Sequence, residues 1–370
     1  RLVSGAGQLQ VRYSTTSAAD SSDLDLLVMD LPLASGSGPG SGAGAADEPT
    51  SGLRSVFAGA FSSTPDQIDY VANVADLQIT SSGASKVAQI HAANPASHNV
   101  YRYSKIAGAA PTDPHWDEVL AADLLWPGPS GQPVTQTQFG WYWLDITTPE
   151  KQAAWVAILV ETLNEYLAIG YDGIYFDNVG IIDPSLINEF PADYTDAGYY
   201  ADVGAVLAGM RAALPGVKFL INSYTGGQPA GLRGLEYLPY TDGMSFEAFS
   251  MKASTKFMDA GRWLQQLGDF AYVVAQGKLT IAMDYMQVGD LQRRMWSLAS
   301  YLLVNSQHSY HRIAGTNVQA DLQQYPEDQL DLGTALGEAV VHVGGVAERS
   351  YSGGKAVSYT PLTLPTNREG

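Results

Sequence analysis

The sequence predicts a (β/α)8 TIM barrel, a fold in which eight strands alternate with helices. Three observations support it: from about residue 55 strand-like segments alternate with amphipathic ones, they cover roughly 255 residues, and several end on an acid. The candidate strands are residues 70–79, 99–105, 141–146, 173–178, 217–222, 243–248, 279–284 and 303–309. A doubly wound open sheet is the alternative, but no Gly-x-Gly-x-x-Gly follows the first strand. We expect one catalytic barrel over residues 55–328.

The first 34 residues have the pattern of a β-rich module. Residues 7–14 and 23–32 alternate like strands. Because two strands cannot form a stable sheet alone, we expect residues 1–34 to be the end of an N-terminal module. Residues 35–54 are rich in Gly, Ser and Pro, which is typical of a linker. They lack the Gly-Lys-Ser/Thr of a phosphate-binding loop.

The clearest helix is predicted between the third and fourth strands, from Glu150 to Ile169. Pro149 after Thr148 is typical of a capped helix start. The apolar residues at helical spacing are Trp155, Ile158, Leu159, Leu163, Tyr166 and Leu167.

After about residue 330 the pattern becomes β-like again. Residues 346–358 are predicted to form a hairpin with a Gly-Gly turn, and we expect residues 329–358 to begin a C-terminal β region. Residues 359–370 show no strand or helix pattern. We interpret them as an unstructured tail, consistent with a truncation scar.

The composition restricts the classes of function. The chain has 370 residues, 45% of them hydrophobic, and a net charge of −18, which disfavours binding to nucleic acid or anionic membranes. There is no cysteine, which excludes disulfides, thiolate catalysis and Cys-ligated zinc. No apolar run approaches the ~20 residues of a membrane span. The chain opens at Arg1 without Met, so a signal peptide could precede it.

Acidic side chains end four of the predicted strands. Asp177 ends the fourth strand and Glu247 the sixth. Asp145 ends the third and Asp284 the seventh. Acids at the carboxyl ends of barrel strands face the rim where such barrels hold their active sites. A single acid there can also cap the following helix, but two behind apolar strands favour catalysis by Asp177 and Glu247.

Aromatic side chains are frequent near the same rim, and such rings can stack on the apolar faces of sugars. These aromatic residues are Tyr101, Tyr103, Trp126, Trp141, Trp143, Tyr175, Tyr224 and Tyr285. Asn222 ends the fifth strand and could bond to a substrate hydroxyl. The predicted substrate-binding residues are Asp145, Trp143, Tyr103, Tyr175, Asn222, Asp284 and Tyr285.

Two carboxyl groups facing one cleft are the usual equipment of a glycoside hydrolase. Asn178 could help to keep Asp177 ionised as the nucleophile, and the apolar residues around Glu247 suit a general acid/base. We expect a retaining mechanism. Inversion stays open, since the separation of the carboxyl groups cannot be derived from the sequence.

Metal and cofactor chemistry are not indicated. His308 and His311 are three residues apart, but no third ligand is spaced to join them. A Ser-His-Asp site lacks its Gly-x-Ser-x-Gly elbow. We expect no metal and no cofactor.

The segment from Trp143 to Gln152, followed by a helix and then residues 170–178, resembles the glycosyl-hydrolase-like (β/α)8 barrels. These are similar to the endo-α-1,4-polygalactosaminidases and, more distantly, to the α-galactosidase and dextranase superfamily. The resemblance covers roughly residues 65–358, including the segment 332–354, which resembles the transition into their C-terminal β-domain. It implies that Asp177 is the nucleophile and Glu247 the acid/base.

The expected partner is a polysaccharide or oligosaccharide, with neither nucleic acid nor membrane insertion. Two alternatives stay open: a non-catalytic barrel that binds glycans, and a transglycosylase that uses the same site. A metal-dependent barrel hydrolase is disfavoured, because no His-x-His strand is present. We expect a secreted or cell-envelope bacterial protein, with a cytoplasmic location still open.

Overall fold

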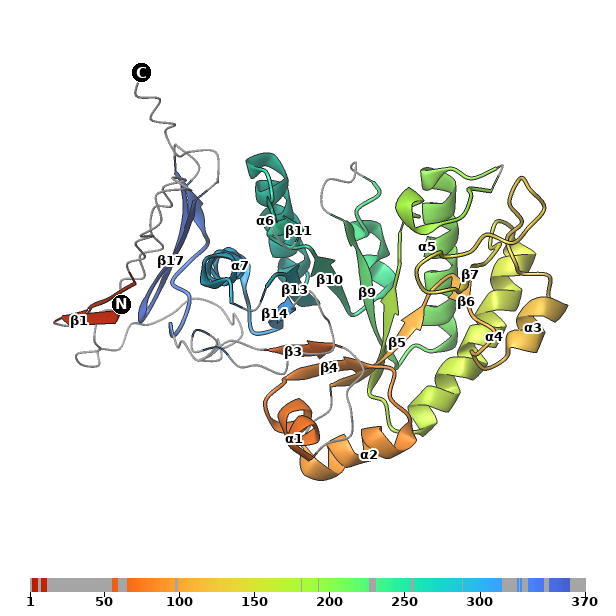
Figure 1. Cartoon of the computed structure of the whole chain (residues 1–370), viewed down its shortest axis with the longest axis horizontal. Helices are drawn as coiled ribbons and strands as arrows, with labels where there is room; N and C mark the ends of the chain where they lie inside the picture. The colour runs from red at the N-terminus through yellow and green to blue at the C-terminus, as the bar shows by residue number, and fades with distance from the viewer. Residues whose placement is uncertain are drawn as a thin grey trace, which may run out of the picture. The chain divides into compact units, whose positions relative to one another are not determined.

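The computed structural model describes residues 2–5, 8–11, 55–58, 65–96, 99–180, 182–191, 193–225, 231–253, 256–287, 289–314, 325, 327, 332–342 and 346–359 (Figure 1). The strand predicted at residues 23–32, the linker at 35–54 and the tail after residue 359 lie outside these ranges. The predicted domain boundaries therefore stay predictions.

Eight strands form the central sheet, in the order β14-β13-β10-β9-β8-β5-β4-β3. They are β3 (Val56–Ala58), β4 (Leu77–Thr80), β5 (Val100–Lys105), β8 (Gly173–Asp177), β9 (Lys218–Thr225), β10 (Gly243–Glu247), β13 (Leu279–Tyr285) and β14 (Ser309–Ala314). Neighbours from β3 through β10 are parallel. Ser55, just before β3, forms a parallel bridge with His311 of β14. The predicted barrel fold is confirmed.

Helices alternate with these strands. They are α1 (Pro65–Asn73), α2 (Ala84–Ala93), α3 (Trp116–Ala121), α4 (Pro149–Ala168), α5 (Asp196–Ala213), α6 (Ala260–Ala275) and α7 (Leu291–Val304), with 3-10 turns at η1 (Pro184–Leu186) and η2 (Leu235–Tyr240). The start predicted for α4 is confirmed, because the Thr148 side chain accepts a hydrogen bond from Lys151 N and Pro149 opens the first turn. Helices α4 and α5 lie side by side (Figure 1).

The strand predicted at residues 70–79 was wrong over most of its length. Residues 65–73 form α1, in which Asn73 Nδ2 donates to Asp69 Oδ1 at 2.9 Å, one helical turn away. Only Leu77–Thr80 is a strand. The first barrel strand is instead β3, which the sequence pattern did not reveal because it is three residues long.

The strand predicted at residues 141–146 was also wrong as a barrel strand. Only β7 (Tyr142–Trp143) is a strand there, and it pairs antiparallel with β6 (Gly108–Ala109) outside the eight-stranded sheet. Leu144 N donates to Ala107 O at 3.1 Å and Trp143 N to Val134 O at 3.0 Å. These partners belong to the excursion between β5 and β8, so the barrel's third strand is β5.

The last predicted strand, at residues 303–309, was displaced. Helix α7 continues to Val304, and the strand β14 begins only at Ser309. The apolar run at the end of α7 reads equally well as a buried strand, and periodicity alone cannot separate the two for so short a segment.

The remaining strands form small antiparallel sheets: β1 (Leu2–Gly5) with β2 (Gln8–Val11), β11 (Met251–Ala253) with β12 (Lys256–Phe257), and β15 (Val340–Val341), β16 (Val346–Tyr351) and β17 (Gly354–Tyr359) together. The hairpin predicted at residues 346–358 is confirmed. Tyr351 pairs with Gly354, so its turn is formed by Ser352 and Gly353 rather than by two glycines.

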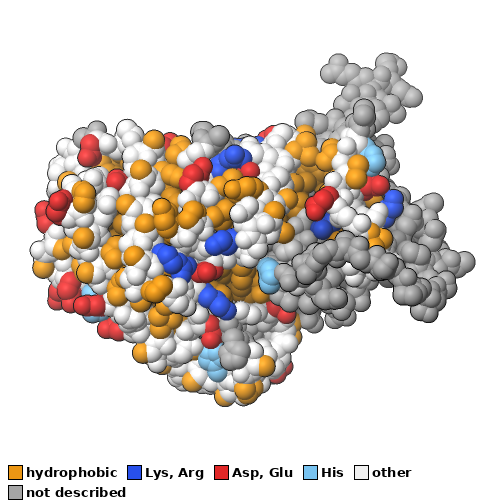
Figure 2. Space-filling view, turned by 180° about the vertical axis from the view of Figure 1, so that it is seen from behind, with side chains coloured by type: hydrophobic (Ala, Val, Ile, Leu, Met, Phe, Trp, Pro, Cys, Tyr) orange, Lys and Arg blue, Asp and Glu red, His pale blue; other side chains and the backbone are white. Residues whose placement is uncertain are grey.

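The chain divides into two compact units. One comprises residues 56–247 and 278–281, and the other comprises residues 1–55, 248–277 and 282–370. Strand β13 begins in the first unit and ends in the second. Among the described helices, none is both long and apolar enough to cross a membrane. On the face in Figure 2, acidic, basic and hydrophobic side chains are interspersed, so acidity is not gathered in one patch there.

Candidate active site

Two regions of the barrel carry the same local pattern. Residues 172–177 and 242–247 both read Asp-Gly, three further residues, then an acid. In each, the leading Asp accepts a hydrogen bond from a backbone N–H at the start of the adjacent strand, at 2.9 Å for the first and 2.8 Å for the second. This contact fixes where β8 and β10 begin, and therefore where their terminal acids lie.

The glycine that follows each Asp is required by close packing. A Cβ on Gly173 would lie 2.5 Å from the Tyr101 ring and 2.9 Å from Lys218 O. A Cβ on Gly243 would lie 2.3 Å from Leu279 O. All three contacts are shorter than real side chains allow, so these strands approach their neighbours more closely than an alanine would permit.

The substitution Gly173→Ala is expected to destabilise the protein by about 2 kcal/mol, since overpacking costs roughly 1–3 kcal/mol. The added methyl must displace a buried ring and a backbone oxygen at once. Thermal unfolding measures the effect. Gly216→Ala is the matched control, because nothing lies within 4 Å of its Cβ position. Equal melting temperatures for the two variants would contradict the packing argument.

A backbone reversal follows each acid. Asn178, directly after Asp177, has a φ of 56°, and Ala248, directly after Glu247, also has a φ of 56°. This left-handed conformation is uncommon for residues other than glycine and costs more for Ala than for Asn. Such strain is concentrated at functional sites, where it is maintained by the surrounding structure. The left-handed conformations of Asn178 and Ala248 therefore indicate a functional site at the ends of β8 and β10.

Four hydrogen bonds hold the Asp177 carboxylate. Tyr103 OH donates to Oδ2 at 2.5 Å, and Asn222 Nδ2 donates to Oδ1 at 2.9 Å. Asn178 contributes its backbone N–H to Oδ1 at 2.8 Å and its Nδ2 to Oδ2 at 3.2 Å. Both oxygens are thus acceptors. The donors come from three successive strands or their ends, so the carboxylate is fixed in orientation.

Asn222 connects the two acids. Its Nδ2 donates to Asp177 Oδ1 and also to Glu247 Oε2. Asn222 lies on β9, the strand between β8 and β10, in register with Ser245. An irregularity in the β9–β10 ladder follows, between Ser245 and Phe246. The structure therefore brings together Asp177, Glu247 and Asn222, all predicted from the sequence.

The substitution Asn222→Ala is expected to lower activity about 10- to 100-fold, because an interaction of 1.5–3 kcal/mol with charged groups is lost. Asp177 and Glu247 would lose the hydrogen-bond donor that they share, but both carboxyl groups would still be present. Turnover of a glycan substrate measures this. Asn73→Ala, which removes an exposed amide that bonds to Asp69 on helix α1, is the control. Full activity in Asn222→Ala would contradict a role for the bridge.

Two predicted aromatic residues lie beside this pair. The rings of Tyr103 and Tyr175 stack with centroids 6.3 Å apart. Tyr175 is buried, whereas Tyr103 is 37% exposed. Tyr103 therefore combines a hydrogen bond to Asp177 with a ring surface open to a ligand. The sequence indicated the ring but not the bond from its hydroxyl.

The structure gives Trp143 and Asp145 other surroundings. Trp143 is buried, with its ring 4.5 Å from that of Trp141. Asp145 Oδ2 accepts from Lys151 Nζ at 2.6 Å, at the start of α4. Partial burial raises the pKa of Asp145, but the hydrogen bonds from Lys151 and Thr147 outweigh burial and lower it. Since residues 141–146 are not a barrel strand, the argument that put these residues on the rim no longer holds.

Asp284 on β13, in the other unit, is also differently placed. Asp284 is 0% exposed and accepts hydrogen bonds from Ser250 Oγ and Ser297 Oγ, both at 2.6 Å, and from the backbone N–H groups of Ser250 and Met251. Burial raises its pKa, while these donors oppose the rise. It thus presents no oxygen to a cleft. Tyr285 is half-buried at the end of the strand.

The described residues hold no group of three or more His, Cys, Asp or Glu side chains arranged to bind a metal. His308 is exposed. His311 is buried, which lowers its pKa to about 3, and its Nε2 lies 3.0 Å from Ser297 Oγ.

Comparison with solved structures finds proteins that resemble this chain. The glycoside hydrolase domain of PelA from Pseudomonas aeruginosa is 17% identical with a TM-score of 0.50, over 72% of this chain and 96% of that chain. Aspergillus fumigatus Ega3 in complex with galactosamine is 14% identical with a TM-score of 0.47, over 76% and 98%. At such identity the likeness to PelA is one of fold, and no curated protein sequence matches the chain.

The family assignment comes from the sequence itself. Residues 94–355 match the hypothetical glycosyl hydrolase family 15, GHL15. This range includes β5, β8, β9 and β10, the strands that carry Tyr103, Asp177, Asn222 and Glu247. The chain therefore belongs to the hypothetical glycosyl hydrolase family 15 and is a glycoside hydrolase with a (β/α)8 barrel.

Proposed function

We propose that this enzyme cleaves the glycosidic bonds of a polysaccharide or oligosaccharide with retention of configuration, using Asp177 as nucleophile and Glu247 as acid/base. One observation carries the proposal: the single nitrogen Asn222 Nδ2 donates to an oxygen of each acid. Two oxygens bonded to one nitrogen lie no further apart than two hydrogen-bond lengths, about 6 Å. Retaining enzymes separate their carboxyl groups by ~5–5.5 Å and inverting ones by ~6.5–9.5 Å, so this bound supports retention.

The assignment of roles follows from the donors around Asp177. Its two oxygens accept hydrogen bonds from Tyr103, Asn178 and Asn222, which hold the carboxylate in one orientation. A nucleophile held in this way needs little reorientation to attack. Glu247, at the end of the strand next but one, is then the group that transfers protons.

In the first step, Glu247 donates its proton to the leaving glycosidic oxygen as Asp177 attacks the anomeric carbon. The bond to the leaving group breaks and a glycosyl ester on Asp177 forms. In the second step, the Glu247 carboxylate takes a proton from water as the oxygen of that water attacks the same carbon. Asp177 leaves as a carboxylate, and both acids regain their starting protonation states.

The substrate we propose is an uncharged glycan polymer. The exposed ring of Tyr103 beside the nucleophile provides a surface on which the apolar face of a sugar can stack. The net charge of −18 disfavours approach of a polyanion. We propose a secreted or cell-envelope location in a bacterium, which fractionation of the source cells tests.

The experiment is a screen of the purified full chain against α- and β-linked polysaccharides, beside Asp177→Asn and Glu247→Gln. Release of reducing sugar by the wild type alone supports the proposal and names the substrate. Proton NMR of the first product formed then distinguishes retention from inversion. Binding without release by all three proteins would leave a glycan-binding barrel, and transfer to an added sugar acceptor in place of water would identify a transglycosylase.

A further inference from the structure

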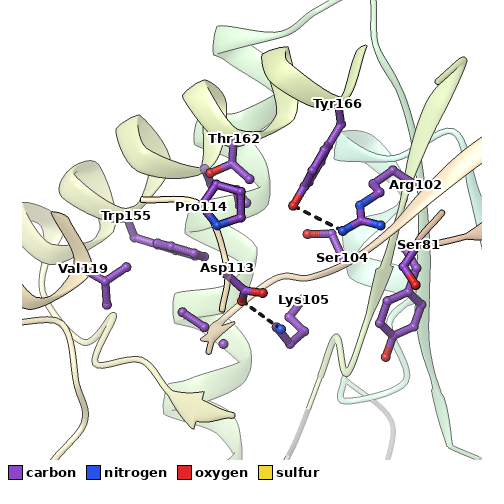
Figure 3. Close-up of a pocket in the computed structure, with 14 residues that line it drawn as sticks. Ser81, Arg102, Ser104, Lys105, Asp113, Pro114, Val119, Trp155, Thr162 and Tyr166 are labelled. Carbon is purple, nitrogen blue, oxygen red and sulfur yellow. Dashed lines mark hydrogen bonds and ion pairs between the residues drawn. The ribbon is translucent and has the colours of Figure 1, made fainter. Parts of the chain in front are cut away.

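A pocket lies between β5 and helix α4 (Figure 3). Its volume is about 240 Å³. Side chains alternate along a strand, so Arg102 and Ser104 lie on the opposite face of β5 from Tyr103, whose hydroxyl reaches Asp177. Neither Asp177, Asn222 nor Glu247 lines this pocket. Tyr103 also lines it, so the pocket adjoins the candidate active site through this residue but does not include the two acids.

The pocket holds a cation that lacks a counter-charge. Arg102 Nη2 donates to Tyr166 OH at 3.3 Å, and the Arg102 guanidinium lies 4.2 Å from the centroid of the Tyr166 ring (Figure 3). Its Nε is buried without a hydrogen-bond partner. Within the described ranges of the chain, Arg102 forms no ion pair with a carboxylate. A half-buried guanidinium that keeps an unused donor is costly unless an acceptor occupies the space beside it.

The other polar groups of the pocket add donors rather than acceptors. The hydroxyls of Ser81 and Ser104 have no hydrogen-bond partner among the residues that the structure describes. Lys105 Nζ lies 2.9 Å from Asp113 Oδ2, so the single acid of the pocket is already neutralised by its neighbour (Figure 3). The pocket thus has a net charge of about +1 in a chain whose net charge is −18.

We propose that this pocket binds a small organic oxyanion, in which a carboxylate or phosphate group on a sugar-sized molecule bonds to Arg102. A planar guanidinium that presents two parallel donors matches the oxygens of such groups. A bare ion would leave much of the volume empty, since a water molecule has a share of only about 30 Å³. The rings of Trp155 and Tyr166, which line the same space, provide apolar surface for the body of the ligand.

Isothermal titration of the full chain tests the proposal with three probes: glucuronate, inorganic phosphate and glucose, the neutral analogue of glucuronate. Saturable binding of glucuronate or of phosphate is expected, and glucose should not bind at the same concentrations. Arg102→Gln should weaken binding roughly 10- to 100-fold, the effect of losing one charged hydrogen bond. Arg262→Gln, on helix α6, is the control and should leave the affinity unchanged.

Two further variants keep the test decisive. Ser104→Ala removes only a hydroxyl, so it should fold normally and weaken binding several-fold even if Arg102→Gln does not fold. Asp177→Asn should bind the probe as the wild type does, because Asp177 does not line the pocket. Binding of phosphate alone would assign the phosphate form of the ligand, and binding of glucuronate alone the carboxylate form. Failure of both probes, equal affinity in Arg102→Gln, or lost affinity in Asp177→Asn would overturn the proposal.

Discussion

Asp177→Asn is expected to lower kcat/KM for glycan hydrolysis by at least about 10³-fold while the protein stays folded. The amide has the shape of the carboxylate and can still accept on one oxygen, but it cannot form the glycosyl ester that the proposed mechanism requires. If the NH2 group takes the place of Asp177 Oδ2, it would face the two donors that now bond to this oxygen, Tyr103 OH and Asn178 Nδ2. A small loss in melting temperature is therefore expected beside a large loss of turnover.

The control for this variant is Asp183→Asn. Asp183 lies six residues along the chain and is exposed, where it caps the turn η1 by accepting from Ser185 N. This variant should retain full activity. A second variant, Asp177→Ala, makes room for azide, which should restore turnover and yield a glycosyl azide. Asp177→Asn with more than a tenth of wild-type activity would eliminate the nucleophile assignment.

The barrel could be predicted because its strongest signals are local. Helix α4 leading into β8 combines helical periodicity, a capped start and a short apolar strand, and each of these can be read within one segment. The predictions were wrong where the secondary structure of a segment depends on its pairing with residues distant in the sequence. The run at residues 141–146 has strand-like side chains, yet its partners are Ala107, Val134 and the strand β6, which no local pattern indicates.

The same distinction separates the predicted site residues that the structure brings together from those that it does not. An acid after a strand can face a cleft, pair with a helix start or be buried, and the sequence alone cannot choose among these. Asp145 pairs with Lys151, and Asp284 is enclosed by Ser250 and Ser297. A usable signal was nevertheless present, since Asp-Gly with an acid four residues after the Gly occurs both at Asp177 and at Glu247.

The bridge through Asn222 could not be predicted in the same way. It requires that β9 lies between β8 and β10 and that the Asn222 amide comes within hydrogen-bonding distance of both acids. The order of strands follows from the barrel fold, but the register depends on the irregularity after Ser245. From the sequence, Asn222 could be predicted only as a polar residue at the rim that contacts the substrate.

Glu247→Gln is expected to lower hydrolysis of the polysaccharide about 10²- to 10⁴-fold, the contribution of a general acid to such a step. The effect should depend on the leaving group. A sugar hydroxyl departs poorly without a proton, whereas nitrophenolate departs without one, so the first step on a nitrophenyl glycoside should remain fast. Stopped-flow absorbance measures it, with Glu150→Gln in the exposed first turn of α4 as the control.

The second step should be slow in Glu247→Gln with either substrate, because it needs the same group as a base to activate water. With the nitrophenyl glycoside, a burst of nitrophenolate close to one equivalent per enzyme should therefore precede a slow steady state. During that phase, intact-protein mass spectrometry should find one sugar attached, and peptide mapping should place it on Asp177. An inverting enzyme forms no such ester. Equal slowing on both substrates, without burst or adduct, would reject both roles together, and the shared hydrogen bonds of Asn222 would then be structural rather than catalytic.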